Sequence, residues 1–192
     1  MGFLDALFGR TTPVQPNLDV LFAIAPAAYT LQAALDVTPS GAGAVCFKQA
    51  EGAGARQSED EILELLHLEP TLAVAVTGDG FGFTWITCRQ QVTDLAALLT
   101  SLHAVNATLA DTGFGPSLLC TVIGFTSDDG ASAHRLGLVY LFKRGTIYPF
   151  APTGAHSRDS TLELQARAAL SGELPIEPEL DRWFPLWDAP VP

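Results

Sequence analysis

Residues 78–83, GDGFGF, are the first candidate for chemistry, because glycine-rich loops bind phosphate groups in nucleotide-binding proteins. Such a loop leads from a strand into the N-terminus of a helix, where free backbone N–H groups face the anion. Here the glycines lie between two apolar, strand-like runs, TLAVAV and FGFTWITC. We therefore interpret this stretch as the turn of a β-hairpin and predict no phosphate site in it.

Possible metal ligands are scattered along the chain. The four histidines have neither HxxxH nor HExxH spacing, so a zinc site would require the fold to bring distant residues together. They are His67, His103, His134 and His156. The run SDDGAS lacks the alternating carboxylates and the twelfth-position glutamate of a calcium-binding EF-hand. We interpret it as the polar tip of a hairpin.

The three cysteines, Cys46, Cys88 and Cys120, lie far apart in apolar runs, and no CxxC occurs. This pattern favours buried free thiols over a disulfide framework and is typical of a reducing cytoplasm. The G-x-S-x-G motif of serine hydrolases is also missing from the sequence. We therefore predict a non-enzymatic protein with no cofactor and no metal.

The charge balance is acidic, with 10 Lys and Arg against 21 Asp and Glu, a net charge of −11. A negative surface repels phosphate backbones and anionic lipid, so the sequence predicts no nucleic-acid partner and at most peripheral membrane contact. The length of 192 residues is that of one domain, and the composition is globular.

Hydrophobic periodicity predicts the elements that must position these residues. A helix is expected to begin at Pro26, and TPSG to end it. The longest helix follows Asp94, with leucines at three- and four-residue steps, and S-x-x-E capping boxes at Ser58 and Ser160 open two others. The expected strands are residues 44–48, TLAVAV, FGFTWITC, SLLCTVIGF, HRLGLVYLF and TIYPF.

Hairpins outnumber crossovers in this order of elements. We therefore predict an α+β fold: one domain with a largely antiparallel sheet of five to six strands packed by helices. The order is similar to that of bacterial secretion-chaperone-like domains. The chain divides into an N-terminal amphipathic helix and connector (1–16), an α+β core (17–172) and a Pro- and aromatic-rich C-terminal arm (173–192).

The two ends of the chain concentrate apolar side chains, and these are the candidate partner-binding residues. They are Phe3, Leu4, Leu7 and Phe8 at the N-terminus and Trp183, Phe184 and Trp187 in the arm. Each end either docks on the body of the same molecule or forms a partner surface, and the N-terminal helix has shallow membrane insertion as a third option. Ten helical residues reach about 15 Å, half of a bilayer core of about 30 Å, and we expect no later segment to span a membrane.

The stretches MGFLDALFGR, PNLDVLFAIAPAAYTLQAAL and GAVCFK resemble the PspA-associated protein B family, PspAB. The resemblance implies an accessory protein of a phage-shock-type envelope-stress response. It would act near PspA, a helical membrane-remodelling coat protein, or near an HtpX-like membrane protease. It would reside in the cytoplasm, at the inner face of the membrane through its partner. It implies no cofactor.

The leading hypothesis is therefore a non-enzymatic adaptor that acts by protein–protein binding. The alternatives are a chaperone-like peptide-binding module, which would form a homodimer, and an enzyme of an unrecognised type.

Overall fold

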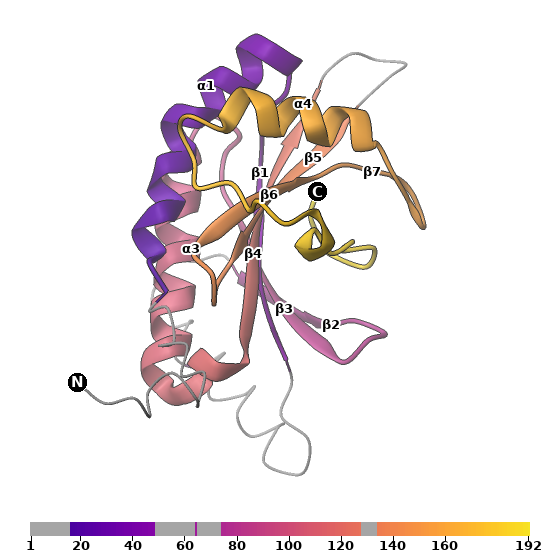
Figure 1. Ribbon diagram of the computed structural model, residues 1–192. Coiled ribbons are helices and arrows are strands. Elements are labelled where there is room, and N and C mark those ends of the chain that lie inside the picture. Colours follow the sequence, from indigo (N-terminus) through magenta and orange to yellow (C-terminus); the bar gives the residue numbers. More distant parts are fainter. Residues whose placement is uncertain (1–15, 49–63, 65–73, 128–133) are drawn as a thin grey trace, which may run out of the picture.

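A six-stranded antiparallel sheet forms the centre of the computed structural model, which describes residues 16–48, 64, 74–127 and 134–192 (Figure 1). The strand order is β2-β3-β1-β4-β5-β6, and every neighbouring pair is antiparallel. The strands are β1 (Thr38–Lys48), β2 (Val74–Gly78), β3 (Phe83–Arg89), β4 (Leu118–Thr126), β5 (Arg135–Leu141) and β6 (Thr146–Phe150). A small hairpin, β7 (Pro152–Gly154) and β8 (Ser157–Arg158), follows. The predicted α+β fold with a largely antiparallel sheet is confirmed.

Three α-helices in the described chain cover one face of this sheet (Figure 1). They are α1 (Ile24–Leu35), α3 (Leu95–Leu109) and α4 (Ser160–Leu170). The start of α3 agrees with the prediction, because the Asp94 carboxylate accepts a hydrogen bond from the Ala97 amide at 3.0 Å. The leucines of α3 are buried against the sheet, as their spacing predicts.

The first helix begins earlier than predicted. A 3-10 helix (Leu18–Ala23), capped by Asn17, runs directly into α1, so Pro26 is the third residue of α1. Proline is tolerated there because the first amides of a helix have no intrahelical partner. Asp36, at φ 54°, ends the helix, and TPSG begins β1 instead of forming a separate stop.

The joined helix also corrects the expectation that no segment could span a membrane. Within the described residues, Leu18–Leu35 is long and apolar enough by length and composition alone. In the fold, its buried residues Leu21, Ile24 and Leu31 pack in the core shared with α3 and α4. Phe22 and Tyr29 are exposed.

Two other local predictions were wrong. The predicted buried strand TLAVAV corresponds to β2, which lies at the end of the sheet and is only partly covered. The predicted Ser160–Glu163 capping box does not form, because Asp159 caps α4 by accepting from the Thr161 and Leu162 amides at 3.0 Å. Glu163 is buried and instead accepts from the Ala151 amide and the Arg158 guanidinium. The Ser58 capping box lies outside the described residues.

The C-terminal arm covers the second face of the sheet (Figure 1). It first runs beside β6, where the Ile147 amide donates to Pro175 O at 2.9 Å and the Glu177 amide donates to Ile147 O at 2.8 Å. It then places Trp183 and Val191 in a second apolar cluster with the inward side chains of the strands. Side chains that alternate along each strand thus point into two different cores, one between the sheet and the helices and one between the sheet and the arm.

Candidate functional site

An apolar pocket of about 460 Å³ lies between the arm and the second face of the sheet. We call it the aromatic groove. Its lining residues are Cys46, Phe81, Phe83, Trp85, Leu119, Cys120, Leu141, Tyr148, Phe184, Pro185, Leu186 and Trp187. The groove therefore combines residues of the β2–β3 hairpin, of strands β1, β4, β5 and β6, and of the arm.

The β2–β3 turn forms one wall of the groove, and Asp79 organises it. One carboxylate oxygen accepts from the Phe81 and Phe83 amides at 2.9 Å, and the other accepts from the Trp85 indole N–H at 2.9 Å. Desolvation acts to raise the pKa of Asp79, but these hydrogen bonds outweigh it and lower the pKa below its usual 3.8. Gly82 takes the positive φ of 81° that the turn requires. Residues 78–83 are thus a hairpin turn, as predicted, and Phe81 stands 63% exposed at the edge of the groove.

The arm forms the opposite wall, and Trp183 anchors it. The Trp183 ring is buried and stacks on Tyr148 at 6.0 Å between ring centroids, and its indole N–H donates to Glu177 O at 3.1 Å. The Tyr148 hydroxyl donates to Phe184 O at 2.8 Å, which fixes the backbone one residue further along the arm. As a result Phe184 projects outward and is 58% exposed.

The predicted partner-binding aromatics of the arm therefore occupy different environments. Trp183 is internal, Phe184 is exposed, and Trp187 is half-buried with ring contacts to Phe150 and His156. The N-terminal candidates Phe3, Leu4, Leu7 and Phe8 lie outside the described residues. Phe81 was missed at the sequence level, although its position between Gly80 and Gly82 in a turn is a signal for an outward-facing side chain.

Two cysteines on adjacent strands form part of the floor of the groove. Cys46 of β1 and Cys120 of β4 are direct register partners, and both are almost completely buried. The hydrogen bond with Cys120, together with burial, raises the pKa of the Cys46 thiol far above its usual value. Burial likewise raises the pKa of the neighbouring Tyr148 hydroxyl. Cys88 lies in the helix-side core, and burial raises the pKa of its thiol to about 12.

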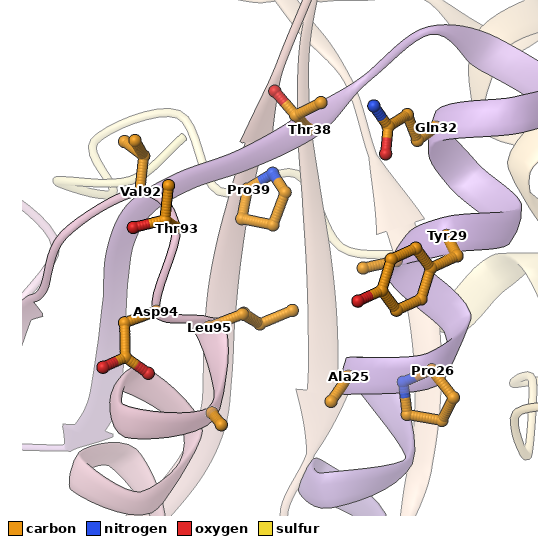
Figure 2. A pocket seen from close by; sticks show the side chains of 12 residues that line it. Ala25, Pro26, Tyr29, Gln32, Thr38, Pro39, Val92, Thr93, Asp94 and Leu95 are labelled. Atoms are coloured by element: carbon orange, nitrogen blue, oxygen red, sulfur yellow. The ribbon is translucent and has the colours of Figure 1, made fainter.

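A second pocket, of about 700 Å³, lies on the helix side, between α1 and the start of α3. Figure 2 shows Ala25, Pro26, Tyr29 and Gln32 on α1 facing the segment of Val92–Leu95, with Thr38 and Pro39 between them. Tyr29 is 77% exposed at its edge. We call this pocket the α1 groove; it is distinct from the aromatic groove, since the two lie on opposite faces of the sheet.

The described histidines are separate from one another. His103 stacks on Phe22 at 5.1 Å between ring centroids, and its Nε2 lies 3.9 Å from Asp19. His156 contacts Trp187. Across residues 16–48, 64, 74–127 and 134–192, no three His, Cys, Asp or Glu side chains gather as a metal-ligand set. His67 and the run 128–130 lie outside these ranges.

Comparison with known proteins extends the resemblance seen in the first quarter of the chain. The family model described as PspA associated protein B (PspAB) matches residues 1–191. No curated protein and no solved structure matches the chain.

Proposed function

This chain belongs to the PspA associated protein B family, and on that premise we propose that it is a non-enzymatic adaptor that binds PspA through the aromatic groove. The family name implies association with PspA. The adaptor acts in the cytoplasm, at the inner face of the membrane, as part of an envelope-stress response. The family resemblance also implies an HtpX-like membrane protease as a second possible partner.

The observation that carries the proposal is the exposure of Phe81 and Phe184 on the two walls of one apolar groove. Exposed aromatic side chains beside an apolar hollow are typical anchors of protein interfaces. Each wall is held by its own hydrogen bonds, Asp79 on the hairpin and Tyr148 to the arm, so the groove is formed before a partner arrives. A preformed site binds more tightly because fewer groups must be ordered on association.

The chemistry of the groove also indicates binding in preference to reaction. The Cys46 thiol and the Tyr148 hydroxyl have raised pKa values, so both are protonated at neutral pH. Apart from the buried Cys120 thiol, the other lining side chains are apolar or indole groups, which provide no general base.

The charge around the groove indicates the kind of segment that fits. Where the hairpin tip meets the arm, the Asp188 carboxylate lies 3.9 Å from the position that a Cβ on Gly80 would occupy, and Asp79 is close by in the same turn. The lowered pKa of Asp79 keeps it ionised. We therefore assign the groove to an amphipathic PspA helix whose apolar stripe is flanked by Lys or Arg, in agreement with the net charge of −11.

The test is a titration of the full-length protein with purified PspA from the same organism, by calorimetry, with Phe81→Ser and Phe184→Ser variants. Truncation of an interface aromatic is expected to cost about 2 kcal/mol, or about 30-fold in Kd. Both side chains are exposed, so the thermal unfolding of the variants is expected to match that of the parent protein.

Tyr29→Ser is the matched control, since it removes an aromatic of the α1 groove that is at least as exposed as Phe81 and Phe184. It is expected to leave the Kd unchanged. If Tyr29→Ser lost binding while Phe81→Ser and Phe184→Ser bound PspA fully, the PspA interface would lie on α1 and not on the aromatic groove. No measurable binding of PspA would refute the partner. Equal binding of unstructured apolar peptides would favour a chaperone-like peptide-binding module instead.

A further inference from the structure

A row of four side chains crosses the floor of the aromatic groove, and two of them are thiols. Trp85 of β3 is the register partner of Cys46, Cys46 is the partner of Cys120, and Cys120 is the partner of Leu141 on β5. All four line the groove. The two sulfurs are therefore neighbours on the same face of the sheet, at the bottom of a hollow that reaches the surface.

From this placement we infer that Cys46 and Cys120 form a reversible dithiol–disulfide site that small disulfides oxidise through the aromatic groove. This site is independent of PspA binding and stands on the positions of the two thiols alone.

The backbone geometry allows the bond. Directly opposite residues of an antiparallel pair have Cα atoms about 4.5–5.5 Å apart, which lies inside the range of about 4.4–6.8 Å found for disulfides. Cys120 is the largest cause of the raised pKa of the Cys46 thiol, so the two side chains already interact. The register shifts immediately after this pair, where Phe47 aligns with Leu118 and Leu119 is the extra residue. Such a bulge loosens the ladder locally, so the strands have room to adjust as the sulfurs approach.

The reaction balances as two successive thiol–disulfide exchanges. Cys120 adjoins the bulge at Leu119 and is slightly more exposed than Cys46, 5% against 2%, so Cys120 attacks the external disulfide first, forms a mixed disulfide and releases one small thiol. The Cys46 sulfur then attacks the Cys120 sulfur, loses its proton and releases the second small thiol. The two protein thiols lose two electrons and two protons in total, and the external disulfide is reduced to two thiols.

Cys88 provides an internal control. It is as deeply buried as the other two, but it lies in the core beneath the helices and does not line the groove. A general loss of structure during oxidation would expose all three cysteines equally, whereas access through the groove reaches only Cys46 and Cys120.

The experiment incubates the full-length protein with glutathione disulfide at mildly alkaline pH, then alkylates free thiols under denaturing conditions and measures intact and peptide masses. The expected product has lost two hydrogens, carries no glutathione, retains one alkylated cysteine at Cys88 and is restored by dithiothreitol. Cys88→Ser is expected to form the same bridge at the same rate. Cys120→Ser is expected to form no internal bridge, and Cys46→Ser to stop at a glutathione adduct on Cys120.

Three results would overturn the inference. One is a folded wild-type protein that keeps three alkylatable thiols after prolonged exposure, under conditions that fully oxidise a dithiol peptide. Another is a bridge that includes Cys88. The third is a Cys46–Cys120 bridge that appears only when denaturant is present, because the groove would then play no part.

Discussion

Replacing Glu177 by glutamine tests the contact that ties the C-terminal arm to the sheet. The Glu177 carboxylate is fully buried and accepts from Arg144 Nε at 2.6 Å, from Arg144 Nη2 at 3.2 Å and from Thr146 Oγ1 at 2.7 Å. The Glu179 amide adds a fourth hydrogen bond at 3.2 Å. The carbonyl of the same residue accepts from the Trp183 indole, so this position orders both ends of the turn that leads to the groove.

The pH dependence of this contact follows from the pKa of Glu177. Desolvation acts to raise that pKa, but the hydrogen bonds from Arg144, Thr146 and the Glu179 amide outweigh it and lower the pKa below the usual 4.5. The unfolded chain therefore binds a proton more readily than the folded one. The stabilisation is fully present above about pH 4.5 and is lost as the pH falls through the lower pKa of the folded state.

Glu177→Gln keeps the shape of the side chain but removes its charge and points an amide N–H₂ at other donors. Hydrogen bonds to charged groups contribute about 1.5–3 kcal/mol each, and breaking a fully buried ion pair costs about 3–5 kcal/mol. Arg144 is 36% exposed and can be rehydrated after the loss of its partner. We therefore expect the free energy of unfolding at pH 7 to fall by about 2–3 kcal/mol, which lowers Tm by about 4–12 °C for a chain of this size.

The assay is urea unfolding of the wild-type and Glu177→Gln proteins from pH 7 to pH 3. The difference in stability is expected to shrink as the pH falls, because protonation removes the same charge from the wild type. Glu179→Gln is the matched control: Glu179 lies 3.6 Å from Arg144 but is 55% exposed, so its loss is expected to cost less than about 1 kcal/mol. A difference between wild type and Glu177→Gln that stays constant over the whole pH range would refute the reasoning.

Two further substitutions test the packing of the second face and of the central strand. Trp183→Ala is expected to cost about 3–5 kcal/mol and to speed amide hydrogen exchange throughout residues 173–192, and unchanged protection of that segment would contradict the role of Trp183 as its anchor. Gly43→Ala is expected to cost about 1–3 kcal/mol in thermal unfolding, because the added Cβ would lie 2.6 Å from Leu102 Cδ1 and 3.0 Å from Val122 O. Gly172→Ala meets no atom within 4 Å and is expected to be neutral or slightly stabilising, so equal losses in the two glycine variants would show that the clash is not the cause.

The sheet and its hairpins could be predicted from sequence because their signals are local. Asp79 and its flanking glycines fix a turn, and Asp94 followed by spaced leucines fixes the start and the buried face of α3. Local sequence signals mispredict structure where a side chain binds groups from other elements. Glu163 fits a capping box with Ser160, but the Arg158 guanidinium and the Ala151 amide bind it instead.

The groove could be predicted only in part. Its arm was recognisable from the cluster of aromatic residues, but the burial of Trp183 and the exposure of Phe184 depend on contacts with Tyr148 and Glu177. The pairing of Cys46 with Cys120 depends on β1 lying between β3 and β4, and no local pattern specifies that neighbourhood.

The pairing of residues 175–177 with β6 affects how the protein would behave after proteolytic cleavage. An unpaired strand edge is a template onto which further chains add, and native sheets are protected against this form of polymerisation. Proteolytic removal of residues 173–192 would uncover the Ile147 backbone and, at the same time, the apolar hollow that Trp183 fills. A clipped molecule would then be able to seed aggregation through its uncovered β6 edge, so this one peptide segment protects that edge of the sheet.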